Sequence, residues 1–378
     1  MSLERIVLMY ITEVSGHHSA TLAIERALKI LSPSAEVINI NAFNYTNPIS
    51  EKLINWIYMA VIKRFPQLWR YLYDNPKVVK RISGIRDVVN KFNAPKLKML
   101  FDQFKPDVVL CSQAFPCGMV ADFKKEYHSD IPLVAVLTDY VPHSFWLYEQ
   151  VDYYVTPSAE VSARLMAKGV AGQKIKALGI PFDPKFNLPI SKEEAAKNLG
   201  LNPAVFTVLI MGGGQGLGPI NTIMQKLEEL PGELQEIVVC GSNKKLYRRI
   251  NKKIKKYKKK IVLFGYAVGV QELMSASDVI ITKPGGITTA EATTKKLPMI
   301  IVKPIPGQEA SNTTYLTQMQ AAIKVEDPKD INLIVRGLMD NPRRLEELSF
   351  AAAATSKPNS TIDIAKLVLE LAQPQGNV

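Results

Sequence analysis

The sequence has little cysteine, and its three cysteines form no recognisable pattern. Cys111, Cys117 and Cys240 have neither the parity of a disulfide framework nor the spacing of a zinc site. No apolar run approaches the roughly 18–20 residues that a membrane-spanning helix needs. The N-terminal apolar run is preceded by an acidic residue and followed at once by polar ones, so it lacks the flanks of a signal peptide. We therefore expect a cytoplasmic protein with reduced, buried cysteines.

Several nucleotide-binding signatures are also missing. The loop GGGQGLG at 212–218 is not a strict G-x-G-x-x-G, and no G-K-[ST] follows it. These departures exclude the usual dinucleotide fingerprint and the P-loop. No internal repeat is present either, so a solenoid is excluded.

Length and composition indicate a two-domain globular protein with an anionic partner. The chain has 378 residues, more than one hydrophobic core usually supports, and 47% of them are hydrophobic. The formal net charge is +12, which favours a nucleotide, a nucleic acid or an acidic lipid surface as partner.

Apolar runs alternate with helical patterns along most of the chain, which predicts α/β domains with parallel sheets. The opening predicts a strand at 5–11, a helix at 20–31 and a strand at 36–41. A proline-rich stretch at 179–184 suits an interdomain linker. We therefore expect an N-terminal domain over 1–183, a C-terminal domain over 184–355, and a last helix within 356–378 that packs back on the first domain.

Two segments are strongly basic. Residues 51–98 contain eleven basic and three acidic residues, with several tryptophans and tyrosines. Such a composition is typical of helices at a lipid headgroup boundary, although a helical insertion with a solvated basic face remains the alternative. The segment 244–260 predicts a basic helix, either a solvated surface or a surface for anionic lipid or nucleic acid. The candidate membrane and acceptor residues in the insertion 49–104 are Trp56, Arg64, Trp69, Arg70, Tyr71 and Arg81.

The stretch ITKPGGITTAE, residues 281–291, predicts an anion site. An apolar strand at 277–282 leads through a tight turn at 283–286 into a helix expected at 288–296. Gly285 and Gly286 would let a ligand approach the backbone near the positive end of that helix. The loop 212–218 follows another strand of the same domain and should face the same sheet edge. Together they indicate a nucleotide-diphosphate site, unless both are packing turns.

Other polar residues have two interpretations. Thr288 and Glu291 have the spacing of a capping box, but Glu291 could instead accept the ribose hydroxyls. Gln308 and Asn312 share a helical face and either satisfy a loop or donate to sugar and phosphate oxygens.

A second set of polar residues ends strands of the first domain. His17 lies where a strand meets a helix start, which disfavours imidazolium and leaves a neutral ring able to act as general base. Asp139 and His143 follow another strand. In an open α/β sheet these carboxyl ends border one crevice, which favours a catalytic group there, with structural residues as the alternative.

The same residues resemble a known family. Six segments together resemble the diacylglycerol glycosyltransferases of glycosyltransferase family 28. They are SGHHSA (15–20), LTDYVPHSFW (137–146), VDYYVTPSAE (151–160), LGIPFDPKF (178–186), IMGGGQG (210–216) and ITKPGGITTAEATTKKLPMIIVKPIPGQEASN (281–312). This group includes monogalactosyldiacylglycerol synthase and processive diacylglycerol glucosyltransferases. The resemblance covers nearly the whole chain. It implies a GT-B fold, with two Rossmann-like domains facing a cleft.

The resemblance also implies residue roles. His17 matches the expected catalytic residue, and Asp139 and His143 match the family's acidic and second histidine positions. The loop with Ser15, Gly16, His17 and His18 has fewer glycines than usual, and His18 stands where plant members carry arginine. The implied donor-binding residues are Gly213, Gly214, Gln215, Phe264, Gly265, Tyr266, Pro284, Gly285, Gly286, Thr288, Glu291, Gln308 and Asn312.

From these observations we expect a peripheral enzyme on the cytoplasmic face of the cell membrane. It would transfer glucose or galactose from a UDP-sugar to the sn-3 hydroxyl of diacylglycerol with inversion. No metal or cofactor is expected, because no DxD motif is present and fixed dipoles would take the cation's place. The alternatives are a transferase acting on a polyprenyl-linked acceptor, a soluble nucleotide-sugar epimerase and a nucleic-acid-binding protein.

Overall fold

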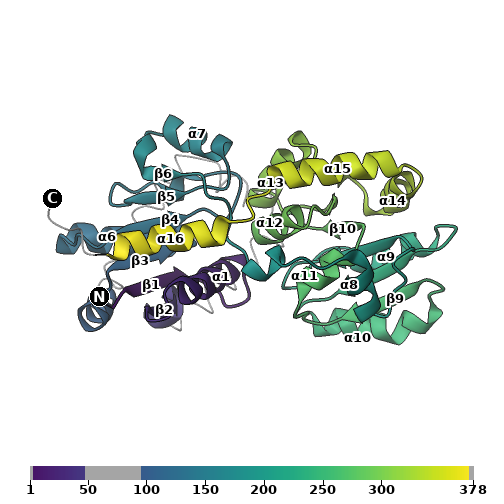
Figure 1. The fold of residues 1–378 in the computed structure, drawn as a ribbon, viewed down its shortest axis with the longest axis horizontal. Helices are drawn as coiled ribbons and strands as arrows, with labels where there is room; N and C mark the ends of the chain where they lie inside the picture. The colour runs from purple at the N-terminus through teal and green to yellow at the C-terminus, as the bar shows by residue number, and fades with distance from the viewer. Residues whose placement is uncertain (1–2, 47–94, 374–378) are drawn as a thin grey trace. The chain divides into compact units, whose positions relative to one another are not determined.

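The computed structural model describes residues 3–46 and 95–373, which form two compact units (Figure 1). The first unit comprises the described residues up to Pro184, residues 306–308, and the described residues from Asn359 onward. The second comprises residues 185–305 and 309–358. None of the helices in 3–46 and 95–373 combines the length and hydrophobicity that a membrane span requires.

The first unit is built on a parallel sheet of six strands in the order β2-β1-β3-β4-β5-β6. Its central strands are buried along their length, which is why they read as continuous apolar runs. The strands are β1 (Arg5–Tyr10), β2 (Glu36–Asn41), β3 (Val108–Cys111), β4 (Leu133–Val136), β5 (Tyr153–Val155) and β6 (Ile175–Lys176).

Helices cover this sheet on both faces. The last helix, α16, packs against α1 and strands β1 and β3, and buries Ile364 and Val368 in their core (Figure 1). Two hydrogen bonds fix its beginning: Ser360 Oγ donates to Ile180 O over 2.8 Å, and Phe182 N donates to Thr361 Oγ1 over 2.9 Å. The helices of this unit are α1 (Gly16–Leu31), α2 (Ala42–Thr46), a helix at 95–104, α6 (Ala114–Tyr127), α7 (Ala159–Ala167) and α16 (Ser360–Ala372).

The second unit repeats this architecture, with six parallel strands in the order β12-β11-β10-β7-β8-β9. Its strands are β7 (Thr207–Met211), β8 (Gln235–Val239), β9 (Lys260–Phe264), β10 (Val279–Thr282), β11 (Met299–Val302) and β12 (Ala322–Val325). Its helices are α8 (Lys192–Asn198), α9 (Ile220–Glu228), α10 (Lys244–Lys253), α11 (Val270–Ser275), α12 (Gly286–Thr294), α13 (Gln308–Gln318), α14 (Ile331–Met339) and α15 (Pro342–Thr355).

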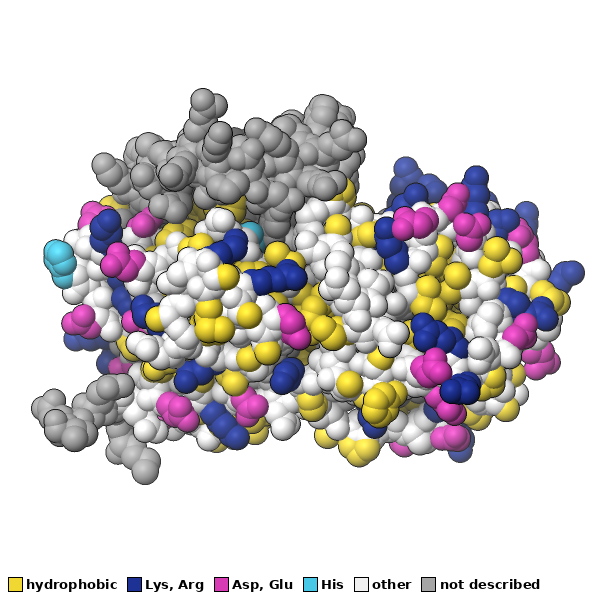
Figure 2. All heavy atoms as spheres, turned by 90° about the horizontal axis from the view of Figure 1, so that it is seen from above, with side chains coloured by type: hydrophobic (Ala, Val, Ile, Leu, Met, Phe, Trp, Pro, Cys, Tyr) yellow, Lys and Arg dark blue, Asp and Glu magenta, His cyan; other side chains and the backbone are white. Residues whose placement is uncertain are grey.

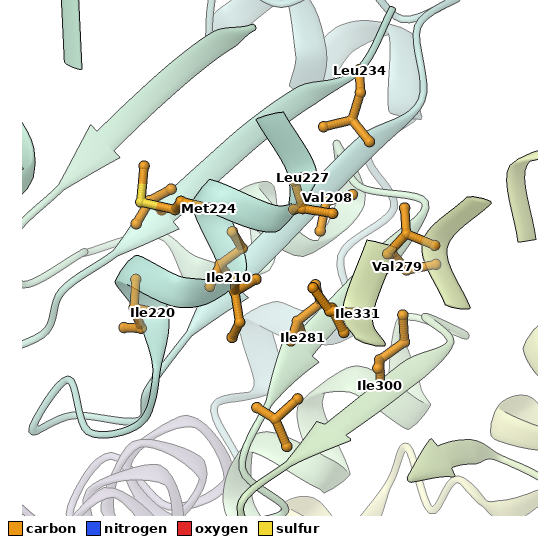
Figure 3. Packing of buried hydrophobic residues seen from close by; sticks show 14 of the residues in the cluster. Val208, Ile210, Ile220, Met224, Leu227, Leu234, Val279, Ile281, Ile300 and Ile331 are labelled. Carbon is orange, nitrogen blue, oxygen red and sulfur yellow. The ribbon is translucent and has the colours of Figure 1, made fainter. Parts of the chain in front are cut away.

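The core of the second unit lies between its sheet and helices α9 and α14 (Figure 3). Val208 and Ile210 of β7 and Val279 and Ile281 of β10 are 0% exposed. In both strands these are alternate residues, so they project from one face of the sheet toward the helices. Burial of such side chains stabilises a fold by about 1.5–3 kcal/mol each.

The structure corrects several element boundaries. Helix α1 begins at Gly16, four residues before the predicted start, because the Ser15 side chain accepts a hydrogen bond from His18 N and caps it. The basic helix ends at Lys253 and continues as a short 3₁₀ turn, Ile254–Lys256. Strand β12 was not predicted, because its four residues carry an exposed lysine and give only a short apolar signal.

Glu236 gives the second unit a pH-dependent stability. It is fully buried in β8, and neither carboxylate oxygen has a hydrogen-bond partner among the described residues. Burial raises its pKa from 4.5 to about 8, and the nearby Glu228 adds to the effect. The folded state therefore keeps a proton that the unfolded chain releases. The free energy of unfolding must then fall by about 1.4 kcal/mol per pH unit as pH rises through this window.

We expect Glu236→Gln to raise the unfolding temperature at pH 8.5 by several degrees and to change it little at pH 5. Circular dichroism melting curves at the two pH values measure the effect. Glu233→Gln, on an exposed loop, controls for the change in net charge. An equal shift at both pH values would show that Glu236 is not the titrating group.

Candidate functional site

The strand order of the first unit reverses between β1 and β3. The chain leaves β1 through α1 toward β2, and leaves neighbouring β3 through α6 toward β4 on the other side. The carboxyl ends of β1 and β3 therefore border a gap between two diverging connections, where open α/β sheets bind ligands. Met9 is paired with Cys111 at this edge, so the loops that follow both strands begin side by side.

His17 stands in the first turn of α1 at this edge. Its Nδ1 lies 2.9 Å from the backbone oxygen of Ser112, just beyond β3. Because a carbonyl oxygen only accepts, Nδ1 carries the proton of this bond, and Nε2 of the neutral ring keeps a lone pair. Thr138 Oγ1, just beyond β4, lies 3.1 Å from the same Nδ1. Two neighbouring strands thus fix the ring in the tautomer that a base acting through Nε2 requires.

The three polar residues predicted at this edge interact electrostatically. Burial lowers the pKa of His17, and the Asp139 carboxylate opposes part of this shift. Burial lowers the pKa of His143 to about 3, and its proximity to His17 contributes. The His143 ring packs against Phe145 and Trp146. Both imidazoles are therefore neutral at pH 7, as a helix N-terminus and a buried site favour.

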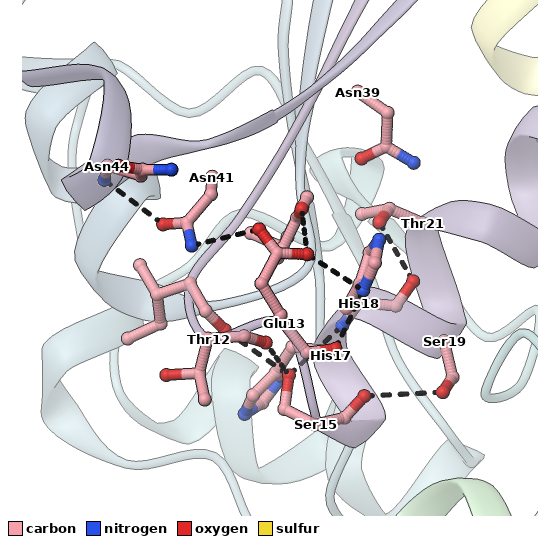
Figure 4. Close-up of polar contacts among 12 residues, drawn as sticks. Thr12, Glu13, Ser15, His17, His18, Ser19, Thr21, Asn39, Asn41 and Asn44 are labelled. Carbon is pink, nitrogen blue, oxygen red and sulfur yellow. Dashed lines mark hydrogen bonds and ion pairs between the residues drawn. The ribbon is translucent and has the colours of Figure 1, made fainter. Parts of the chain in front are cut away.

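The loop before His17 is held by its own side chains (Figure 4). The His18 ring stacks on Tyr10, with centroids 4.1 Å apart, and its Nδ1 lies 2.8 Å from Glu13 O. Tyr10 Oη donates to Glu13 Oε2 over 2.9 Å, and Asn41 Nδ2 donates to Glu13 Oε1 over 3.3 Å. These contacts link the loop to β1 and β2, so the start of α1 is set by the sheet. Glu13 and Ser112 were not identified from the sequence, because nothing in the spacing ties them to His17.

The second unit has its own strand-order reversal, between β7 and β10. The chain leaves β7 through α9 toward β8, and leaves β10 through α12 toward β11 on the opposite side. Met211 and Thr282 are paired across these strands. The loop 212–218 and the turn 283–286 follow them directly, so both glycine segments start from adjacent positions at one sheet edge. The sequence predicted a common sheet edge for the two segments, and the strand order makes them neighbours on it.

The glycines of the 212–218 loop allow backbone segments to meet. A Cβ on Gly216 would lie 1.8 Å from Cys240 O, and its φ is +59°. Gly241, after β8, has φ +57° and would meet Gly214 O at 2.5 Å. Ser242 N donates to Gly214 O over 2.8 Å. These positions require glycine, so part of the loop's glycine content serves packing, as the alternative interpretation held.

Helix α12 begins at Gly286 with Gly285 at its N-cap, two residues before the predicted start. Thr288 is therefore inside the helix, so of the two interpretations of Thr288 and Glu291 the capping box is wrong. No side chain of the described residues caps this helix, and the first bond into its backbone is Thr289 N to Gly285 O, 2.9 Å. The N–H groups of the first turn thus point out of the helix end, where an anion is favoured.

Two contacts tie the turn to α13. Asn312 is 0% exposed, and its Nδ2 donates to Pro284 O over 2.9 Å. Lys283 Nζ lies 2.6 Å from Glu309 Oε1, and Glu309 Oε2 accepts from Ile305 N over 2.7 Å. Asn312 therefore supports the turn, which is one of its two predicted roles. Asn312 and Pro284 are 28 residues apart in sequence, and Lys283 and Glu309 are 26 apart, so no local pattern revealed either contact.

The other predicted donor residues are distributed over both units. Gln308, the first residue of α13, belongs to the first unit, where its Nε2 donates to Asp139 Oδ2 over 2.9 Å. Glu291 is partly buried within α12. Phe264 ends β9, where Gly265 follows, and the Tyr266 side chain is 67% exposed. The candidate membrane residues Trp56, Arg64, Trp69, Arg70, Tyr71 and Arg81 lie outside the described residues.

Comparisons with known proteins match both units. The family model described as monogalactosyldiacylglycerol (MGDG) synthase matches residues 17–182, and that of the glycosyltransferase family 28 C-terminal domain matches residues 207–366. A processive diacylglycerol beta-glucosyltransferase of Bacillus cytotoxicus is 28% identical over 366 residues, 96% of this chain and 92% of the relative. One of Bacillus cereus is 28% identical over 358 residues, 94% of this chain and 90% of the relative. The chain thus combines a domain of the monogalactosyldiacylglycerol synthase family with a glycosyltransferase family 28 C-terminal domain.

Solved structures show that the chain has the predicted GT-B fold of two parallel α/β units. MurG of Acinetobacter baumannii superimposes with a TM-score of 0.63 at 15% identity, covering 97% of this chain and 99% of that one. MnaA of S. aureus, solved with UDP, gives a TM-score of 0.62 at 14% identity and covers 98% of both chains. Anabaena HepE, solved with UDP-glucose, gives 0.58 at 12% identity and covers 97% and 98%.

The glycine loop at 212–218 provides a stability test with a matched control. We expect Gly216→Ala to lower the free energy of unfolding by more than about 2 kcal/mol, because its Cβ would collide with Cys240 O. Gly213 also has a positive φ, +69°, but open space around its Cβ, so Gly213→Ala should cost about 1 kcal/mol. Urea unfolding of both variants measures the difference. Equal losses would mean that the loop does not depend on its contact with Cys240.

Proposed function

We propose that the protein transfers glucose or galactose from a UDP-sugar to the sn-3 hydroxyl of diacylglycerol. The family provides the acceptor class, since the curated relatives are named as diacylglycerol glucosyltransferases. The observation that carries the mechanism is the fixed tautomer of His17, whose Nε2 is a proton acceptor at the strand-order reversal of the first unit. The uncapped start of α12, beside the glycine loop, supports a diphosphate site in the second unit.

In the proposed reaction the hydroxyl oxygen of diacylglycerol attacks C1 of the hexose. The new C1–O bond forms as the bond from C1 to the diphosphate oxygen breaks, and the hydroxyl proton passes to His17 Nε2. Asp139 stabilises the imidazolium that results, because its charge raises the pKa of His17. Attack on the face opposite the diphosphate inverts the anomeric configuration. The UDP product leaves with one more negative charge than the esterified diphosphate carried.

Charge on the leaving diphosphate requires compensation, and we propose that backbone dipoles provide it without a metal or cofactor. The first-turn N–H groups of α12 and the positive end of its dipole would lie at the diphosphate oxygens. Removing one such donor in other enzymes costs about 3–4 kcal/mol of transition-state stabilisation. The Lys283–Glu309 ion pair would hold the turn in place, with side chains 11% and 17% exposed. We place the enzyme on the cytoplasmic face of the cell membrane as a peripheral protein, because its acceptor resides in a bilayer.

The test is to incubate the purified protein with diacylglycerol and either UDP-glucose or UDP-galactose, and to analyse the lipids by mass spectrometry. We expect a hexosyl-diacylglycerol from one of the two donors, with a β linkage by NMR and an unchanged rate in EDTA. An α linkage would contradict inversion, and a rate abolished by EDTA would contradict metal independence. Transfer only to a polyprenyl-linked acceptor, or epimerisation of a nucleotide sugar without transfer, would replace the proposed function by the corresponding alternative.

A further inference from the structure

A strongly basic surface covers α10 and the chain that follows it. Residues 244–260 contain eleven Lys and Arg and no Asp or Glu. Leu246 and Ile250 are buried and hold the helix on the core of the second unit. Lys259 binds the backbone oxygens of Leu230 and Gly232 through Nζ. The other ten bases are exposed, and we call them the α10 basic face: Lys244, Lys245, Arg248, Arg249, Lys252, Lys253, Lys255, Lys256, Lys258 and Lys260.

Among the described residues the α10 basic face is poorly neutralised: the Glu228 carboxylate reaches the segment, but only through the backbone N–H groups of Lys258 and Lys259. None of its ten side chains forms an ion pair with an acidic side chain of the described residues. Elsewhere in the same unit basic side chains have acidic partners: Lys226 with Glu229, and Arg336 with Asp340. The face of the molecule in Figure 2 likewise shows Lys and Arg beside Asp and Glu. Ten like charges on one segment repel one another, so the face favours a polyanionic partner.

This face is attached to the proposed donor site. Asn243 caps α10 by accepting from Leu246 N over 3.0 Å, and its Nδ2 donates to Gly216 O over 3.3 Å. Ser242 N donates to Gly214 O in the same loop. A surface bound along α10 would therefore lie next to the segment that we propose holds the sugar donor.

We propose that the α10 basic face docks the second unit on an anionic lipid bilayer. This inference rests on the proposed function, which places the acceptor in a membrane. A lipid surface suits a helix face with many exposed lysines, each attracted without a specific geometry. Nucleic acid is less suitable because Tyr247 and Tyr257 pack against the core, so the segment offers no exposed aromatic ring for base stacking.

The test compares two variants of the full chain with the same change in charge. Lys245, Arg248 and Lys252 lie three and four residues apart, on the helix face opposite Leu246 and Ile250. K245Q/R248Q/K252Q removes three charges there, and glutamine preserves the helix. The control, K197Q/K329Q/K357Q, removes three exposed lysines elsewhere in the unit. Affinity is measured by sedimentation with vesicles of phosphatidylcholine containing about one third phosphatidylglycerol.

We expect the α10 variant to bind these vesicles about a hundredfold more weakly than the wild type at low salt, at about fivefold per charge. The control should lose less than about threefold, and 0.5 M NaCl should weaken the wild type to the level of the α10 variant. Equal losses in the two variants would overturn the proposal, as would a wild type that binds an RNA oligonucleotide but not the vesicles.

A detergent assay separates this proposal from the proposed function. With diacylglycerol in neutral micelles, both variants should transfer hexose at the wild-type rate, since neither alters the proposed site. Loss of vesicle binding with unchanged transfer in micelles would confirm the docking face. If the wild type transfers no hexose in micelles from any UDP-hexose, the proposed function fails, and the sedimentation experiment still decides whether the face binds lipid.

Discussion

Replacing His17 by asparagine is expected to lower the rate of hexose transfer by a factor of about 10²–10⁴, the usual contribution of a positioned general base. Asparagine can still donate to Ser112 O from its Nδ2, so the contact that joins α1 to β3 is retained. It has no atom equivalent to Nε2, so the proton acceptor is lost. Single-turnover transfer from the UDP-sugar that supports activity measures the chemical step.

His18→Asn is the matched control, because His18 also bonds a backbone oxygen through Nδ1 but faces Tyr10 and Glu13. It should reduce transfer by less than about tenfold. UDP affinity measured by calorimetry should be unchanged in both variants. If folded His17→Asn retained more than a tenth of the wild-type rate, His17 would not be the base.

The same assignment predicts the pH dependence of the wild type. Burial lowers the pKa of His17 below 6.5, so its neutral, base-competent form persists throughout the range above 6.5 and is lost only as pH falls through the lowered value. We expect kcat/KM to decline on an acid limb that lies below pH 6.5 and that is absent from the residual activity of His17→Asn. An acid limb centred above pH 6.5 would indicate a different group.

Gly285→Ala is expected to weaken UDP binding at least tenfold while leaving the fold intact. The residue has φ −66° and ψ 140°, which alanine adopts freely, and no protein atom lies within 4 Å of the added Cβ. The methyl group would therefore occupy only space that a ligand at the start of α12 needs. Isothermal titration calorimetry with UDP measures the affinity, and thermal unfolding tests the fold.

Gly337→Ala is the matched control for this substitution. Gly337 lies exposed in α14, away from the glycine segments, and a Cβ added there would likewise meet no atom within 4 Å. Alanine at this position should raise stability by about 0.5–1 kcal/mol through helix propensity and leave UDP affinity unchanged. Wild-type affinity in Gly285→Ala would mean that no nucleotide approaches the backbone at this turn.

The helix starts at both sites show where local sequence rules fail. Gly16 and Gly286 are poor helix formers, so the pattern placed both helices later in the chain. In the structure Ser15 caps α1 and the paired strands β7 and β10 fix where α12 begins. The first-turn N–H groups of α12 have no side-chain cap, which lowers the local stability of the helix. Such violations of a local rule are typical of functional sites.

The sequence by itself determined the fold class and most of the strands. Strands buried on both faces must be continuously apolar, and alternation with helices requires parallel pairing. It also determined which chemical groups end the strands, so His17, Asp139 and the two glycine segments were predicted as site residues. The basic character of 244–260 was likewise evident, because charge depends on composition alone.

Only the tertiary structure decided which of these ends meet. The strand orders place β1 beside β3 and β7 beside β10, although β1 and β3 are about a hundred residues apart in the chain. Ser112 O sets the tautomer of His17, although the two residues are 95 apart in sequence. Glu309 pairs with Lys283, 26 residues before it. Such contacts arise from the order of strands in a sheet. Local periodicity carries no information about that order, because hydrogen bonding between strands involves backbone groups that every residue shares.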